Sequence, residues 1–482
     1  MKGILRALLW AWVFSALTGC MVGPDHQTPK PILPDRWHAS RDTASPPRRL
    51  DTAALMTWWL TFNDPQLTRL IEEARRQNLD LKIVYQRIEQ ARSEQNANRA
   101  DLYPRISAAG AAARVSNLFP VQGPSGNAFD YFLAGFDAVW EIDVFGRLRR
   151  RLESAQAQTT AAVEDYRQAF VVLAAEIARH YVEYRGLQSA KSLTETMLGL
   201  QTTKAELIGH RVKDGLSTRD ELDRVQALER TTRAELNTLE ATLVDARHRI
   251  ELLLGKQPDS LTFTLSQDGG NPGAELRLLS QPADILRYRP DIRGAERQLA
   301  SATAMQGAAL AELFPKISVA AFLGLHNSDL ENLFRSSAFA WASAASISQP
   351  LFNFGKIRAG ISLTDARQRE AFLNYQKTVL TALHECETGL SEYLKENQRQ
   401  NELQQALDHL EDAGRLAEQR FQGGLGTRLA QLDAELATHA AKMALLQSRV
   451  AVSTRLIALY KALGGGGLEP VRLEDEPLRP WG

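Results

Sequence analysis

The sequence predicts a mainly α-helical, internally duplicated chain with two pairs of amphipathic strands, which can close a β-barrel only together with the strands of other copies. Three observations predict this fold class. Long proline-free stretches are rich in strong helix formers. Two short regions alternate apolar and polar side chains, as half-buried strands do. The second half of the chain repeats the landmarks of the first at a constant spacing.

The N-terminus has the pattern of a lipoprotein signal peptide. Met1–Arg6 is short and basic, and Ala7–Leu17 is apolar but shorter than the ~20 residues that a membrane-spanning helix needs. Small residues then precede Cys20, as in a lipobox. We therefore predict a signal peptide at 1–19 and a lipidated Cys20, the alternative being an ordinary signal peptide with a coincidental cysteine. Met21 follows where an Asp would favour retention at the inner membrane, so export to the outer membrane is expected.

The mature chain begins with an extended segment at 20–50, because six prolines between positions 24 and 47 exclude a helix there. The first helical stretch starts at Asp64-Pro65, with Asp64 as its N-cap and the proline in its first turn.

The first repeat is predicted at 51–257. After its initial helices, a strand pair lies at 105–144, and its second strand alternates apolar side chains with acidic ones. A helix from position 147 to 211 would be ~95 Å long at 1.5 Å per residue. Gly215 breaks it, and a second helix returns to Leu254, so 147–254 forms a long helical hairpin.

The second repeat is predicted at 282–463, after a linker or belt at 258–281. It contains a strand pair at 316–351 and a helical hairpin at 356–462, and an irregular tail follows at 464–482. Four landmarks hold one spacing within two residues: Asp80 with Asp291 and Pro104 with Pro315 at an offset of 211, and Gly146 with Gly355 and Gly215 with Gly424 at an offset of 209.

Composition and motifs give no sign of an enzyme. With 57 Lys+Arg against 57 Asp+Glu the charges balance, whereas a nucleic-acid partner needs a basic excess on one face. Cys20 and Cys386 are the only two cysteines, too few for a disulfide framework or a zinc site. The run His384–Glu387 has side chains of the kind that bind metals. Neighbouring residues on a helix point about 100° apart, however, so these side chains do not converge on one ion. Gly464–Gly467 follows a helix instead of opening one, which predicts a linker. We expect no catalytic residue, no cofactor and no metal.

Four strands per chain cannot close a membrane barrel, which needs at least about eight. The chain must therefore oligomerise, and symmetry allows eight strands from two copies or twelve from three.

Several segments resemble the outer-membrane factor family of tripartite efflux systems, the relatives of TolC, OprM and NodT. They are Trp58–Leu67, Asp143–Gly146, Ile285–Leu299 with its Arg-Pro-Asp stretch, Ala311–Ser318, and Gly23-Pro24-Asp25 after the lipobox. The similarity covers nearly the whole mature chain, and the lipobox places it nearer the OprM/NodT branch.

This resemblance implies a homotrimer in the outer membrane of a Gram-negative bacterium, anchored by lipid at Cys20. Its twelve strands would form one outer-membrane β-barrel, continued by a periplasmic α-barrel of twelve helices. The implied function is passive conduction of small molecules or drugs from an inner-membrane pump of the RND, ABC or MFS type, RND being favoured, through a periplasmic adaptor. The alternatives are a structural lipoprotein that tethers envelope layers and an export duct for type I secretion; a tether would need no amphipathic strands.

The resemblance also places a periplasmic gate at Leu429 and Asp433, which lie one helical turn apart. The sequence departs from the family at Ala430 and Leu436, which puts the gate's salt bridges in doubt. Arg211 and Arg420 could form gate salt bridges with Asp220, Glu221 or Asp223, although ordinary surface ion pairs explain these two arginines equally well. The adaptor would dock on Gly215, Leu216, Ser217, Gly424, Leu425 and Thr427. The strand carboxylates Asp137, Glu141 and Asp143 could face the lumen, or could simply be solvated.

Overall fold

The computed structural model describes residues 21–39, 52–115, 129–261, 283 and 288–467. The predicted signal peptide, Cys20, most of the 258–281 linker and most of the 464–482 tail lie outside these ranges. No helix within the described residues has the length and apolar character needed to cross a bilayer.

The predicted class, mainly helical with a small sheet, is confirmed. The helices are α2 (Thr52–Met56), η1 (Trp58–Phe62), α3 (Pro65–Gln77), α4 (Leu79–Ala100), α5 (Arg147–Lys213), α6 (Arg219–Leu253), α8 (Pro290–Ala311), η3 (Leu330–Asn332), η4 (Ser336–Ala338), α9 (Lys356–Gln422) and α10 (Arg428–Ala462). Corresponding helices of the two repeats have equal lengths: 22 residues in α4 and α8, 67 in α5 and α9, and 35 in α6 and α10.

The first cap follows the local sequence. The carboxylate of Asp64 accepts hydrogen bonds from the backbone N–H groups of Gln66 and Leu67, at 2.8 and 3.2 Å, and Pro65 occupies the first helical turn. The other carboxylate oxygen of Asp64 accepts from the hydroxyl of Tyr181 on α5, at 2.7 Å. One side chain thus both starts α3 and attaches it to the long helix.

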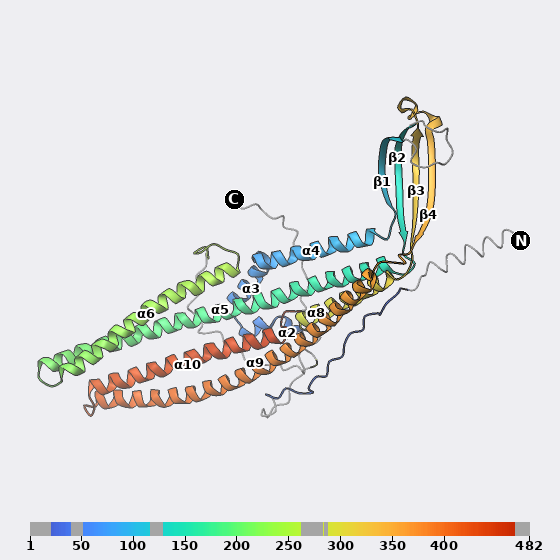
Figure 1. Cartoon of the computed structure of the whole chain (residues 1–482). Helices are drawn as coiled ribbons and strands as arrows, with labels where there is room; N and C mark the ends of the chain where they lie inside the picture. The colour runs from blue at the N-terminus through green and yellow to red at the C-terminus, as the bar shows by residue number, and fades with distance from the viewer. Residues whose placement is uncertain (1–20, 40–51, 116–128, 262–282, 284–287, 468–482) are drawn as a thin grey trace. The chain divides into compact units, whose positions relative to one another are not determined.

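Four antiparallel strands form one sheet in the order β1–β2–β3–β4 (Figure 1). They are β1 (Arg105–Val115), β2 (Phe129–Ile142), β3 (Lys316–Asn327) and β4 (Phe339–Ser348). The central pair, β2 with β3, joins the two repeats. The outer strands, β1 and β4, form the two edges of this sheet.

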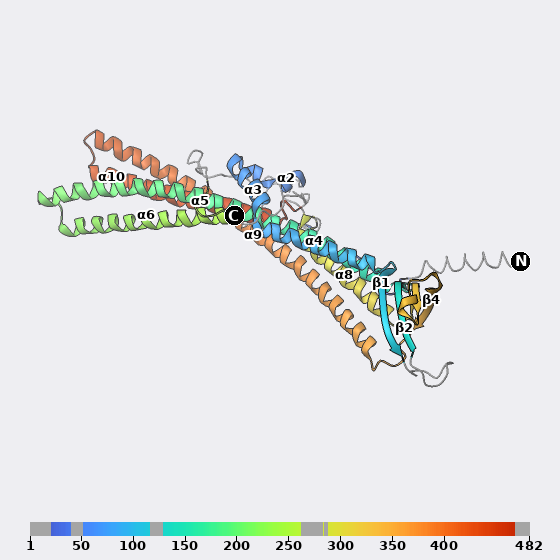
Figure 2. The same ribbon diagram turned by 90° about the horizontal axis from the view of Figure 1, so that it is seen from above.

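The chain divides into two compact units, each described by itself. The first contains the sheet and is built from 1–30, 86–162 and 294–376, and the second from 31–85, 163–293 and 377–482. In the second unit α6 returns beside α5, and α10 beside α9, so that each repeat ends in a helical hairpin (Figures 1 and 2). Contacts such as the Lys191–Glu240 pair, at 2.8 Å, hold α6 against α5.

The glycine run after α10 is not the linker that the sequence suggested. All four residues of Gly464–Gly467 are buried. A Cβ added at Gly465 would lie 2.6 Å from the indole of Trp58, and one at Gly467 would lie 2.7 Å from the ring of Pro290. The glycines permit this close packing because they lack a side chain, a reason that the local sequence could not reveal.

Candidate functional site

The two tip turns of the helical hairpins have the same backbone geometry. Gly215 and Gly424 both have φ of +72°, in the left-handed region that favours glycine. The N–H groups of Leu216 and Leu425 each donate, at 2.7 Å, to the carbonyl five residues earlier, on Arg211 and Arg420. This is the Schellman pattern that ends a helix at a left-handed glycine.

Threonine begins the return helix at each tip. The hydroxyls of Thr218 and Thr427 cap α6 and α10 by accepting from the N–H three residues on. Between glycine and cap, the side chains of Leu216 and Leu425 are 66% and 85% exposed. The predicted docking residues therefore include two exposed leucine side chains on turns whose backbone is fixed by hydrogen bonds.

Leu429 and Asp433 lie on the first turns of α10, just after the second tip. Leu429 is half-buried, whereas Asp433 has 58% of its side chain exposed. The Asp433 carboxylate forms an ion pair with the ammonium of Lys204, which lies on α5. Sequence reasoning missed Lys204, because nothing in its local sequence identifies a partner 229 residues away.

The predicted gate salt bridges are not formed within the described chain. Arg211 donates from Nε to the hydroxyl of Ser217, at 3.1 Å, and from Nη2 to the carbonyl of Leu216, also at 3.1 Å. Asp220 pairs instead with Arg224, one turn along the same helix. The guanidinium of Arg211 thus stabilises its own tip turn, and Arg420 has no ion pair within these ranges.

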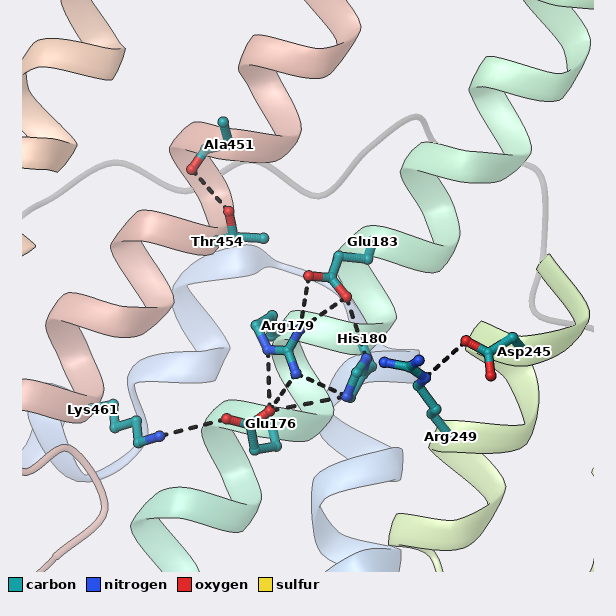
Figure 3. A network of polar contacts seen from close by, with 9 residues as sticks. All are labelled: Glu176, Arg179, His180, Glu183, Asp245, Arg249, Ala451, Thr454 and Lys461. Carbon is teal, nitrogen blue, oxygen red and sulfur yellow. Dashed lines mark hydrogen bonds and ion pairs between the residues drawn. The ribbon is translucent and has the colours of Figure 1, made fainter. Parts of the chain in front are cut away.

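A polar network further along α5 connects this helix to the end of α10 (Figure 3). Arg179 bridges two carboxylates of its own helix, Glu176 at 2.5 Å and Glu183 at 2.9 Å. The imidazole of His180 lies 3.3 Å from Glu183, and Lys461 of α10 reaches Glu176 at 3.5 Å. Burial acts to raise the pKa values of Glu176 and Glu183, but hydrogen bonds outweigh it, mainly from Arg179 to Glu176 and from His180 to Glu183, and both pKa values are lowered.

The three predicted lumen acids have different environments. Asp137 lies within β2 and is half-buried, while Glu141 forms an ion pair with Arg147, at 2.7 Å. Asp143 lies beyond the end of β2 and has a side chain only 9% exposed. Its carboxylate accepts from the backbone N–H of Arg149, at 2.8 Å, and so caps the first turn of α5. For Asp143 the lumen-facing expectation is wrong, because the carboxylate is used by the helix start.

The chain just after Cys20 is attached to the start of α5. Met21 packs against Gly146, and the N–H of Val22 donates to the carbonyl of Phe145, at 3.2 Å. Arg150 is 1% exposed and donates to the carbonyl of Val22 and to the carboxylate of Asp25. Cys20 itself lies outside the described residues, but the residues next to it have a defined position.

Of the run from His384 to Glu387, Cys386 is buried, whereas His384 and Glu385 are exposed. Cys386 is buried and its thiol donates to the carbonyl of Ala462, at 3.2 Å; burial raises the pKa of this thiol to about 12. Arg289, from the Arg-Pro-Asp stretch, donates to the same carbonyl at 2.8 Å and pairs with Glu385 at 2.7 Å. Among the described residues, no group of three or more His, Cys, Asp or Glu side chains could hold a metal ion.

Comparison with known proteins gives matches over almost the whole chain. The model of the family described as "Outer membrane efflux protein" matches residues 70–256 and 282–465, one stretch in each repeat. The solvent efflux pump outer membrane protein SrpC of Pseudomonas putida is 31% identical over 461 residues, covering 93% of this chain and 96% of SrpC. The cation efflux system protein CusC of Escherichia coli strain K12 is 30% identical over 462 residues, covering 94% and 97%.

Solved structures agree with these matches. The outer-membrane channel OprN is similar with a TM-score of 0.84 and 32% identity, covering 93% of this chain and all of that one. The open state of the MtrE outer membrane channel of Neisseria gonorrhoeae gives a TM-score of 0.79 and 28% identity, covering 93% and 98%.

Proposed function

Because this chain belongs to the outer membrane efflux protein family, we propose that three copies form one passive duct, which an inner-membrane pump and a periplasmic adaptor supply with solutes. The chain is an efflux channel protein of the Gram-negative outer membrane, with its helical part in the periplasm. The proposal concerns the assembly, the partners, the anchor and the gate.

The observation that carries the proposal is a four-stranded sheet with two open edges on a chain whose helices form two long hairpins. Open edges in lipid would leave backbone groups unpaired, at several kcal/mol each. Three copies supply twelve strands, enough to close the sheet around a water-filled lumen.

The gate lies near the tips, at Leu429 and Asp433. Threefold symmetry stacks a leucine ring beside a carboxylate ring, about 6 Å apart along the helix axis. An apolar constriction resists wetting, and the Asp433 carboxylates would attract cations and repel anions once they separate from the Lys204 ammonium groups that neutralise them in the single chain. The Lys204–Asp433 pair supports this role, because it fastens α10 to α5 beside that constriction. Adaptor contact at the tips opens the gate by spreading the helices.

The rim that meets the adaptor consists of the predicted docking residues, Gly215, Leu216, Ser217, Gly424, Leu425 and Thr427. Support comes from the exposure of both leucines on turns that are fixed by hydrogen bonds. The pump is of the RND type, and the cargo consists of small molecules or drugs. Relatives named for solvent, toluene, antibiotic and cation efflux show how wide the range of cargo in this family is.

Lipid on Cys20 anchors the chain in the outer membrane. Support comes from the lipobox and from Met21 and Val22, which lie where the sheet meets the start of α5. Lipid at this point would enter the periplasmic leaflet of the outer membrane, because the residues after Cys20 lie at the helical end of the sheet.

Conductance of the purified protein in a planar bilayer tests the proposed duct. We expect pores that are closed most of the time at rest and large when open. Native mass spectrometry in detergent tests the assembly, for which three copies are expected. A protein that stays monomeric or dimeric and passes no current would contradict the proposal.

A further inference from the structure

The two repeats share contacts as well as sequence landmarks. Within repeat one, the indole N–H of Trp140 donates to the carbonyl of Leu102, at 2.9 Å. Within repeat two, the amide of Gln349 donates to the carbonyl of Leu313, at 3.1 Å. Trp140 and Gln349 differ by 209 positions, and Leu102 and Leu313 differ by 211, which are the offsets of the sequence landmarks.

The strand registers obey the same rule. In the first hairpin Arg105 faces Val139, and in the second Lys316 faces Ser348. Moving the first strand by 211 positions, from 105 to 316, and the second by 209, from 139 to 348, converts one register into the other. The offsets can therefore transfer a contact from one repeat to the other residue by residue.

A second group of contacts runs from repeat one to repeat two. The ring of Phe145 stacks on that of Phe314, with centroids 4.7 Å apart. Arg147 lies 3.7 Å from the carboxylate of Glu312, and β2 pairs with β3. In each case the start of a long helix, or the strand before it, contacts the helix end or first strand of the other repeat.

The reverse contacts, from repeat two to repeat one, are missing in the described part of the single chain. By the two offsets, Phe354 is the equivalent of Phe145, and Tyr103 is the equivalent of Phe314. Phe354 and Tyr103 are 105% and 65% exposed. Likewise Lys356 is the equivalent of Arg147, and Asp101 is the equivalent of Glu312. Lys356 and Asp101 are exposed and form no ion pair within the described residues. Phe354 also has φ of 49°, a costly conformation for a bulky residue.

We infer that a second copy of this chain supplies these contacts in a register that the internal repeat fixes. The ring of Phe354 stacks on Tyr103 of the next copy, and Lys356 pairs with Asp101 of that copy. The inference rests on the proposed function, because it takes the open-edged sheet to be one part of a closed ring.

The same transfer gives the strand register between copies. In β2–β3, Phe136 faces Leu323 and Ala138 faces Ala321. With the offsets applied, Ala345 of β4 faces Ala112 of β1 in the next copy, and Ile347 faces Gly110. A slip of one residue would move every side chain of one strand to the other face, so this register is a specific claim.

Cysteine cross-linking tests the register. Residues that face each other across antiparallel strands have neighbouring Cβ atoms on the same face. We expect Ala345→Cys with Ala112→Cys, oxidised with copper phenanthroline in detergent, to give covalent dimers and trimers on a non-reducing gel. The matched control is Ala345→Cys with Ala113→Cys, whose second cysteine points to the opposite face. We expect it to give roughly tenfold less cross-linked product. Cys386 is buried with a raised thiol pKa, so it remains in both variants.

Native mass spectrometry of the same samples separates two kinds of failure. Trimers in which the Ala113 pair cross-links as well as the Ala112 pair, or better, would overturn the register and leave the proposed duct intact. A wild-type protein that is monomeric would overturn the proposed assembly and the inference together.

Discussion

Lys204 on α5 and Asp433 on α10 form an ion pair across 229 residues of sequence, one helical turn beyond Leu429. Both side chains belong to the second unit, so this pair connects the two helical hairpins of one chain. It is the described contact that most directly relates the proposed gate to the helices that would have to separate.

Loss of this pair should make the resting duct leakier. An exposed ion pair contributes roughly 0–1 kcal/mol, so its loss should shift the opening equilibrium of each copy about fivefold or less, and Lys204→Gln, which removes the pair from all three copies, should raise resting conductance. The double substitution Leu429→Ala with Asp433→Ala removes the apolar ring as well as the ion pair. It should raise resting conductance severalfold and let large antibiotics through without a pump. Lys213→Gln is the matched control on the same helix, because Lys213 is exposed and has no ion pair within the described residues. Wild-type conductance in an assembled Leu429/Asp433 double variant would show that the gate lies elsewhere.

Bulky or charged groups at the tips should disrupt adaptor docking. We expect Gly215→Trp with Gly424→Trp to abolish both adaptor cross-linking and efflux. These substitutions also strain a left-handed backbone, so Leu216→Asp with Leu425→Asp serves as a second variant that leaves both glycines in place. Gly199→Trp is the control, since a side chain there meets open space on α5. Efflux at the wild-type level in both tip variants would place the rim elsewhere.

Palmitate labelling should depend on Cys20 alone. We expect Cys20→Ser to lose the label completely, because only this cysteine lies in a lipobox. Cys386→Ser should keep it, because that thiol is 2% exposed and donates to a backbone carbonyl. Metabolic labelling followed by immunoprecipitation measures both. A label that persists in the Cys20 variant would rule out the lipoprotein.

The network around Arg179 should stabilise the protein at neutral pH and not in acid. The pKa values of Glu176 and Glu183 are lowered in the folded state, because hydrogen bonds from Arg179 and its neighbours outweigh burial. Their contribution is therefore present above the ordinary carboxyl pKa of about 4.5 and is lost as the pH falls through the lower folded value.

Glu176→Gln and Glu183→Gln should each lower stability at pH 7 by about 1 kcal/mol or less, because both carboxylates are about one-third exposed. Near pH 3 the difference from wild type should shrink. Thermal unfolding at the two pH values measures this, with Glu402→Gln on α9 as an exposed control. An equal loss at both pH values would mean that the carboxylates act through packing alone.

Features encoded by a few adjacent residues could be predicted from the sequence. The Asp64 cap, the glycine turns at positions 215 and 424 and the duplication all depend on local chemistry or on spacing. Helix rotation and close packing could not be inferred in this way. The partner of Asp433, the buried position of Arg150 and the capping role of Asp143 depend on which elements meet in space. The buried glycines after α10 show the same limit, because neighbours distant in sequence, Trp58 at Gly465 and Pro290 at Gly467, leave no room for side chains there.

The matched helices also restrict how such a protein can change length during evolution. Both long helices have 67 residues and both return helices have 35. Seven residues inserted into α5 alone would move Gly215 by about 10 Å relative to Gly424. Compensation would require an insertion of equal size in α6, and then in both helices of the other hairpin. Related proteins should therefore tolerate insertions in their loops. A change in the length of the hairpins should add or remove the same number of turns in all four helices, α5, α6, α9 and α10.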